Sequence, residues 1–332
     1  MSGLRTVYMG TTEFAASVLR RIAASRHRPA LVVAPPDRRR GRGQHLASPP
    51  AAEAARELEI ELLQTADVNG AEELERIRAA GAELGVVCAF GQIIGQTLLA
   101  ELELWNVHPS LLPRWRGAAP VERAIMAGDS ETGISIALVT EGLDSGPVAL
   151  AESVRIEPQD DYGTLSSRLA ELAGELAVTA LERRASGELE TREQDEDVAT
   201  YAEKIDSEER ALDPARPASE LAATVRALTP QVGAHLELEN GEWLGVRAST
   251  AVEEEIPQGR LVASAGASTG PIGALGEAEG EHSRSGGRPG AGHALLLGCA
   301  QGTLRLDIVK PAGKREMSAE QYLRGHSVPA LR

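Results

Sequence analysis

The stretch RTVYMGTTEF, residues 5–14, joins a short apolar strand to the first turn of a helix. The strand, from Arg5 to Met9, ends at Gly10, where the backbone can turn sharply. The threonine hydroxyls that follow can accept hydrogen bonds from the free amides of a helix, which we expect to run to about Ala24. This arrangement predicts that the chain opens with the strand and helix of a βαβ unit.

The alternation of strands and helices continues beyond this opening. Apolar runs predict strands at 30–34, 60–63, 84–88, 104–108, 134–140 and 148–156, and helical periodicity predicts helices at 51–58, 71–80, 120–126 and 162–184. Such alternation is typical of an α/β fold with a doubly wound, mostly parallel sheet. Because ligands of these folds bind at the carboxyl ends of the strands, the loops there are the place to search for chemistry.

A change in composition predicts a boundary between two domains. Residues 1–200 would form the α/β domain, and the acidic, polar segment at about 186–205 would be a linker. Residues 206–332 contain short predicted strands, which indicate a second, smaller β-rich domain. Within it, residues 264–293 are rich in Gly, Ser and Ala and almost lack large apolar side chains. We therefore expect them to be a disordered insertion.

The charge balance excludes one class of nucleic-acid-binding protein. The chain has 332 residues, 34 basic and 49 acidic, and a net charge of −15, so it cannot present a uniformly basic surface to a polyanion. A local exception is the glycine-containing run at 38–43, which holds four guanidinium groups, those of Arg38, Arg39, Arg40 and Arg42. This arginine loop is a candidate contact for a polyanion, and a merely solvated charged loop is the alternative.

The sequence predicts a cytoplasmic protein that binds neither membrane nor metal. The longest uncharged run in the body of the chain, 84–100, is shorter than the roughly 20 apolar residues that span a bilayer, and the first residues lack the pattern of a signal peptide. Cys88 and Cys299 lie far apart among apolar or small neighbours, which indicates buried side chains rather than a disulfide or a thiolate site. The histidines do not show the spacing of metal ligands.

A polar pair stands at the end of the predicted strand 104–108. Side chains two residues apart on a strand project to the same face, so Asn106 and His108 would sit together at the lip of the sheet. An amide beside an imidazole suits a reaction that builds a negative oxygen at a carbonyl, because both groups can donate to the oxyanion. A structural histidine at a polar strand end is the alternative.

The loop EGLDSG, residues 141–146, places one carboxylate between two glycines. If this loop folds over the crevice, Asp144 could orient His108 and relay a proton. Taken alone, Asp144 would be an ordinary turn aspartate.

Together with the run Ser110-Leu111-Leu112-Pro113, these three side chains resemble the folate-dependent formyltransferases, which use an Asn, His, Asp triad with 10-formyltetrahydrofolate. Further motifs are similar to the methionyl-tRNA branch of that family: GTTEFA (10–15), PDR (36–38) with GRG (41–43), LPRWRGAAP (112–120), YA (201–202) with KI (204–205), and PAGK (311–314) with Met317. The arginine loop and the PAGK end are not expected together in other branches. The resemblance implies a Rossmann-like formyltransferase domain followed by an OB-like β-barrel domain.

The resemblance also implies the reaction, its substrates and its site. The formyl group of 10-formyltetrahydrofolate would pass to the amino group of methionyl-initiator tRNA, with no metal and no covalent enzyme intermediate. Asn106, His108 and Asp144 would be catalytic, and the other implied contacts fall into two sets. Folate would lie against Ser110, Leu111, Leu112 and Pro113 and against Phe90, Gly91, Gln92, Ile93 and Ile94; tRNA would meet Arg38, Arg39, Arg40, Arg42, Lys310 and Lys314.

Two alternatives remain open from the sequence. One is a formyltransferase that acts on an amino sugar or another small amine. The other is a folate-binding or RNA-binding module without catalysis, in which the triad would have no chemical role.

Overall fold

The computed structural model describes residues 3–40, 45–265 and 293–332. The chain forms two compact units. Unit 1 comprises Met1–Ala124, Asp129–Glu157 and Thr164–Lys204, and unit 2 comprises Ile125–Gly128, Pro158–Gly163 and Ile205–Arg332. The expected disordered insertion at 264–293 falls almost wholly outside the described residues, as does Arg42.

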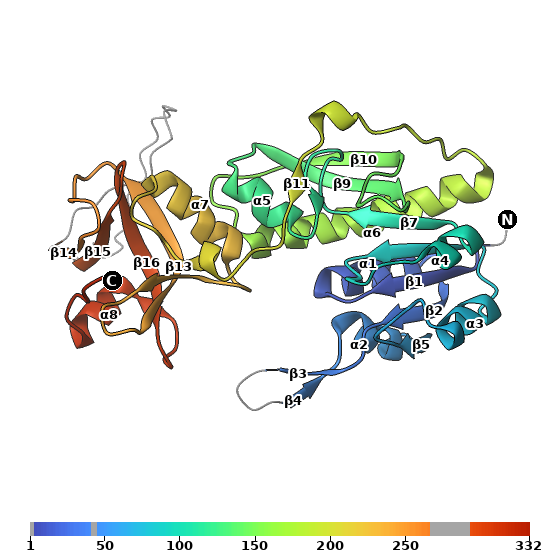
Figure 1. The fold of residues 1–332 in the computed structure, drawn as a ribbon, viewed down its shortest axis with the longest axis horizontal. Coiled ribbons are helices and arrows are strands. Elements are labelled where there is room, and N and C mark those ends of the chain that lie inside the picture. Colours follow the sequence, from blue (N-terminus) through green and yellow to red (C-terminus); the bar gives the residue numbers. More distant parts are fainter. Residues whose placement is uncertain (1–2, 41–44, 266–292) are drawn as a thin grey trace, which may run out of the picture. The chain divides into compact units, whose positions relative to one another are not determined.

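Unit 1 is built on a mostly parallel sheet, as the sequence predicted. Its strands are β1 (Thr6–Gly10), β2 (Pro29–Ala34), β5 (Glu61–Gln64), β6 (Leu84–Cys88), β7 (Leu104–His108), β9 (Glu131–Leu138) and β10 (Val148–Arg155). They lie in the order β10-β9-β7-β6-β1-β2-β5 (Figure 1). The five strands from β7 to β5 are parallel, whereas β9 pairs antiparallel with β7, and the edge strand β10 pairs antiparallel with β9. The order reverses direction between β6 and β1, where a doubly wound sheet offers its ligand crevice.

Helices connect these strands. They are α1 (Glu13–Ala23), α2 (Pro50–Glu57), α3 (Ala71–Ala79), α4 (Gln96–Glu101), α5 (Pro120–Met126) and α6 (Tyr162–Ser186). The predicted start of α1 is confirmed, because the Thr12 hydroxyl accepts a hydrogen bond from the Ala15 amide at 3.3 Å. The buried Tyr8 hydroxyl donates to the Ala15 carbonyl at 2.6 Å and so fixes the helix against β1.

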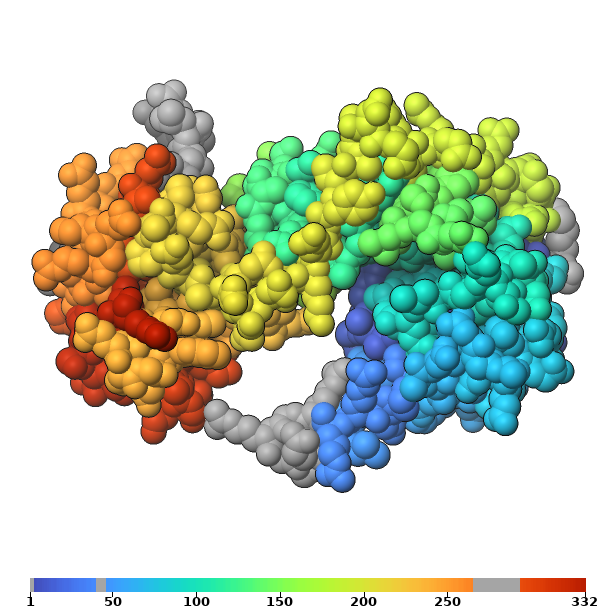
Figure 2. Space-filling model, viewed as in Figure 1, coloured from blue at the N-terminus to red at the C-terminus, as the bar shows by residue number. Residues whose placement is uncertain are grey.

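The arginine run forms part of a hairpin and not only a loop. Arg38–Arg40 is strand β3, which pairs antiparallel with β4 (His45–Ala47), and this hairpin extends from the β2 side of unit 1 (Figures 1 and 2). The Asp37 carboxylate accepts hydrogen bonds from Ser48 and from Gln64, each at 2.7 Å, so the two ends of the hairpin share one anchor. These hydrogen bonds lower the pKa of Asp37.

Unit 2 contains an antiparallel sheet, which confirms the β-rich domain that the sequence predicted for this part of the chain. Its strands β12 (Ala234–Glu237), β13 (Trp243–Val252), β16 (Thr303–Pro311), β15 (His293–Gly298) and β14 (Leu261–Ala265) follow one another in that order, and β17 (Met317–Ser318) pairs with β16. Helices α7 (Ala218–Leu228) and α8 (Ala319–Gly325) supply side chains to the same core, among them Leu221, Val225 and Tyr322.

Cys88 and Cys299 are both buried and free, as predicted. Burial raises the pKa of the Cys88 thiol to about 12, so this sulfur is not a nucleophile near neutral pH. Within the described parts of the chain, none of the helices has the length and apolar character needed to cross a bilayer.

One helix of unit 1 carries a carboxyl group in an unfavourable environment. Burial raises the pKa of Glu122, in the first turn of α5, to about 6. The folded state therefore favours the protonated form, and the associated stability is present below about pH 4.5 and lost as pH rises through 6. A pKa difference of this size corresponds to about 2 kcal/mol.

We expect Glu122→Gln to raise the free energy of unfolding at pH 7 by up to about 2 kcal/mol and to have little effect at pH 4.5. Urea unfolding followed at both pH values measures the difference. Glu72→Gln is the matched control, because it removes the same charge from the first turn of α3 at an exposed position. Equal effects of the two variants at pH 7 would show that burial of Glu122 is not the cause.

Candidate active site

The three predicted catalytic side chains come together at the carboxyl end of β7. The Asn106 amide donates to Oδ1 of Asp144 at 2.8 Å, and Nδ1 of His108 lies 3.7 Å from Oδ2 of the same carboxylate. Both His108 and Asp144 are largely shielded, with side chains 5% and 14% exposed. Strand periodicity places Asn106 and His108 on one face, and the loop after β9 brings Asp144 to them across 38 residues of sequence.

The hydrogen bonds of His108 assign its proton. Its Nε2 lies 2.9 Å from the carbonyl oxygen of Trp115. Because a carbonyl oxygen can only accept, Nε2 carries the hydrogen, and the neutral ring has its lone pair on Nδ1. Nδ1 is the nitrogen that faces Asp144, so it can take up a proton and the carboxylate can stabilise the resulting positive charge.

Asp144 is held by partners from several parts of unit 1. Besides Asn106, the backbone amide of Gly117 donates to its Oδ2 at 2.8 Å. Its own backbone is in the left-handed region, with φ of 49°, a conformation that L residues other than Asn and Asp seldom adopt. The loop that carries it is also held by Gln96, whose amide donates to Glu141 at 2.9 Å.

Residues 200–202 form hydrogen bonds with the turn that follows β7. Strand β8 (Arg116–Gly117) pairs in parallel with β11 (Tyr201–Ala202). Thr200 also accepts a hydrogen bond from the Trp115 amide through its hydroxyl at 2.9 Å. The segment that we expected to be a linker thus positions the carbonyl that binds His108 and the amide that binds Asp144.

The two segments predicted to contact folate occupy different surroundings. Ser110 is buried and donates to the Arg114 carbonyl at 2.6 Å, while Leu111, Leu112 and Pro113 are partly exposed on the turn beside β9. In the other segment, Phe90 is buried but Ile93 is 87% exposed.

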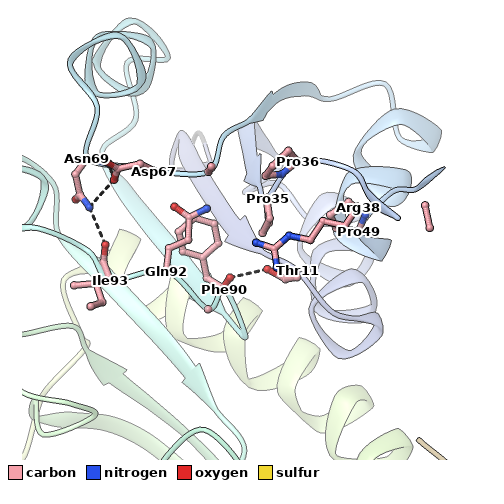
Figure 3. A pocket seen from close by; sticks show the side chains of 13 residues that line it. Thr11, Pro35, Pro36, Arg38, Pro49, Asp67, Asn69, Phe90, Gln92 and Ile93 are labelled. Atoms are coloured by element: carbon pink, nitrogen blue, oxygen red, sulfur yellow. Dashed lines mark hydrogen bonds between the residues drawn. The ribbon is translucent and has the colours of Figure 1, made fainter. Parts of the chain in front are cut away.

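The second folate segment borders a pocket of about 440 Å³ at the carboxyl ends of β1, β2, β5 and β6. Phe90, Gly91, Gln92 and Ile93 line one side, and the side chain of Arg38 reaches in from the hairpin (Figure 3). Gln92 has a structural role, because it bonds both to the Val68 amide and to the Thr65 carbonyl. Neither the triad nor Ser110–Pro113 lines this pocket.

The predicted tRNA contacts are divided between the two units. Arg38, Arg39 and Arg40 lie on β3 of unit 1. Lys310 lies on β16 of unit 2, with its Nζ 3.6 Å from Glu316, and the exposed Lys314 follows that strand. Among residues 3–40, 45–265 and 293–332, no group of three or more His, Cys, Asp or Glu side chains could hold a metal ion.

The residues that hold the triad in place give little signal in the sequence. Gln194 and Thr200 lie in a stretch whose polar, acidic composition indicated a linker, so periodicity offered no signal for them. Arg116 and Gly117 were visible only as part of a family motif. The burial of Arg116 appears only in the structure.

Comparisons with known proteins cover nearly the whole chain. Residues 4–181 match the formyl transferase family model, and residues 204–327 match the model of its C-terminal domain. The methionyl-tRNA formyltransferase of Methylococcus capsulatus is 36% identical to this chain over 99% of both chains. That of Parvibaculum lavamentivorans is 35% identical over 98% of both.

Solved structures share the fold at lower identity. HypX from Aquifex aeolicus in complex with tetrahydrofolic acid matches all of this chain with 51% of its own, at a TM-score of 0.61 and 15% identity. The N-formyltransferase from Helicobacter canadensis, in complex with folinic acid and dTDP-3-aminofucose, matches 91% of this chain with 98% of its own, at a TM-score of 0.61 and 15% identity.

Proposed function

Because this chain belongs to the formyl transferase family, we propose that it transfers the formyl group of 10-formyltetrahydrofolate to the amino group of methionyl-initiator tRNA. The observation that carries this proposal is the full-length similarity to methionyl-tRNA formyltransferases, which spans both units. The arrangement of Asn106, His108 and Asp144 suits formyl transfer. The hairpin of β3 and β4, which carries the arginine run, offers a contact for the polyanionic tRNA. We place the reaction in the cytoplasm, where charged tRNA is made and used.

The reaction is a direct transfer. The nitrogen of the methionyl amine attacks the formyl carbon, and the carbonyl oxygen becomes negative in a tetrahedral intermediate. The bond between this carbon and N10 of the folate then breaks, N10 gains a proton, and the amine has lost one. The site therefore has two tasks, to stabilise the oxyanion and to move one proton.

His108 moves the proton. Its Nδ1 is unprotonated when Nε2 donates to Trp115, so Nδ1 can accept a proton from the attacking amine and pass it to N10. Asp144, 3.7 Å away, stabilises the imidazolium that forms between these two transfers. No covalent intermediate with the enzyme is required.

Asn106 stabilises the oxyanion. One of its two amide hydrogens is engaged by Asp144, which orients the group and leaves the other hydrogen for the developing negative oxygen. His108 contributes a second donor only after Nδ1 has gained its proton, so the two oxyanion donors act in sequence.

We assign the acceptor RNA to the side of unit 1 where Arg38 lines the pocket, and the folate to the turn at Ser110–Pro113 beside the triad and to the segment Phe90–Ile94. The pocket lies next to β6, the neighbour of the catalytic strand β7. Lys310 and Lys314 would contact RNA through unit 2.

The deciding experiment measures formyl transfer from 10-formyltetrahydrofolate to each of three acceptors. These are charged initiator tRNA, uncharged initiator tRNA and an amino sugar nucleotide. Formylation of the charged tRNA alone is the expected result. Transfer to the amino sugar instead would establish the alternative substrate class, and folate binding without transfer to any acceptor would establish a binding module.

Replacing Arg38 by alanine should weaken tRNA binding and reduce the slope of log Kd against log salt by about one unit. A complex with one phosphate contact fewer releases fewer condensed counterions when it forms. Binding measured across a salt series tests this. Arg155→Ala is the control, since it removes the same charge from β10 at the opposite edge of the sheet. Identical slopes in the two variants would exclude a phosphate contact by Arg38.

A further inference from the structure

The side chain of Gln194 links the catalytic loop to a buried arginine. Its amide nitrogen donates to the backbone carbonyls of Asp144 and Gly146, at 2.8 and 2.6 Å. Its amide oxygen accepts from Nε and Nη2 of Arg116, at 3.1 and 3.0 Å. One side chain therefore uses both ends of its amide to join segments that are about 50 and 78 residues away in sequence.

Arg116 is a rigid anchor for this link. Its side chain is 1% exposed, and Glu196 accepts two further hydrogen bonds from it, at 2.7 and 2.8 Å. Its neighbours in sequence are the two residues whose backbones bind the triad, since the Trp115 carbonyl accepts from His108 and the Gly117 amide donates to Asp144. A displacement of Arg116 would therefore disturb both catalytic contacts.

The Asp144 loop needs such an anchor. Asp144 has φ of 49°, a left-handed conformation that aspartate tolerates better than most L residues but that still costs free energy, so contacts with the loop help to maintain it. Leu143, the preceding residue, is 63% exposed, and Glu141 and Gly142 are exposed as well, so packing against the core does not hold the part of the loop before Asp144. The two hydrogen bonds from Gln194 act directly on the backbone of Asp144 and on the glycine two residues later.

We propose that Gln194 is a positioning residue for formyl transfer. It holds the backbone of the Asp144 loop so that the carboxylate stays against Asn106 and His108, and Arg116 orients the Gln194 amide so that its N–H groups point at the loop carbonyls. The guanidinium also polarises that amide, which strengthens its donation. This inference rests on the proposed function, because the triad it positions is assigned there.

Two substitutions of Gln194 distinguish a role in positioning the Asp144 loop from a role in folding of the protein. Gln194→Glu has nearly the same shape and a stronger partner for Arg116, but an ionised carboxylate cannot donate to the two carbonyls and repels them. Gln194→Ala removes both sets of contacts. We expect kcat to fall about ten- to a hundredfold in both, with KM for either substrate changed less than threefold, because a misplaced catalytic group lowers the rate without removing a binding contact.

The matched control is Glu193→Ala, which truncates the exposed side chain that precedes Gln194 in the same segment. It should keep kcat within about threefold of the unaltered protein. Hydrogen exchange of the amides at residues 142–146 gives a readout independent of catalysis, and exchange there should accelerate in both Gln194 variants but not in Glu193→Ala.

A Gln194→Glu protein with unchanged kcat and unchanged exchange at 142–146 would overturn the proposal. So would an equal loss of kcat in Glu193→Ala, because the effect would then not depend on the hydrogen bonds of Gln194. If the unaltered protein failed to formylate any acceptor, the proposed function would fall. The exchange measurement would still decide whether Gln194 holds the loop.

Discussion

Replacing His108 by alanine is expected to lower kcat for formyl transfer by about two or more orders of magnitude. The variant loses the nitrogen that carries the proton from the amine to N10, together with the imidazolium that Asp144 stabilises. The Kd for folate should change little, because the proton transfer by His108 takes place only after folate has bound and stabilises the transition state rather than the bound ground state. Single-turnover formylation and a folate titration on the same preparation test both statements.

Asn106→Ala belongs to the same experiment and should also lose about two orders of magnitude, for a different reason. It removes the donor to the oxyanion and one of the hydrogen bonds that orient Asp144. If either variant turned over at the rate of the unaltered protein, the mechanism would be wrong. The double variant should be little slower than the slower single one, because the residues act as a unit.

Gly117→Ala is expected to have the other large effect. Gly117 has φ of 116°, and a Cβ there would lie 2.8 Å from the backbone oxygen of Ala202, closer than real Cβ atoms approach. The backbone of β8 must shift to relieve this contact, and its amide is the one that donates to Asp144. We expect a loss of kcat of at least tenfold and of stability of about 1–3 kcal/mol.

Gly187→Ala is the control for the backbone conformation itself. Gly187 follows α6 with φ of 76°, and a Cβ there would meet nothing within 4 Å. This variant should lose about 1 kcal/mol of stability and keep its kcat. Thermal unfolding measures the stability that each variant loses, and steady-state assays measure its kcat. Together they distinguish the cost of a side chain at positive φ from the displacement of the Gly117 amide that binds Asp144. Equal kcat in both would mean that the Gly117 amide has no role in catalysis.

The interior elements of both units were predictable because their signals are local. Helix α5 runs over the residues 120–126 that periodicity indicated, and the cap of α1 comes from a hydroxyl three residues before the amide it binds. Helix α4 was missed because its six residues are too few to show a helical period. The arginine hairpin was missed because a run of like charges carries no apolar alternation, although the anchor at Asp37 lets it pair.

The sequence by itself determined the mostly parallel sheet, the β-rich second unit and the placement of Asn106 beside His108, since each follows from the pattern of side chains along the elements. Only the tertiary structure decided the rest of the site. It brought Asp144 to that pair, gave the Nε2 proton of His108 a carbonyl partner and placed Gln194 between Arg116 and the loop. These contacts join residues that are distant in sequence and polar in character. Their partners depend on how strands and loops meet in space, which no local period encodes.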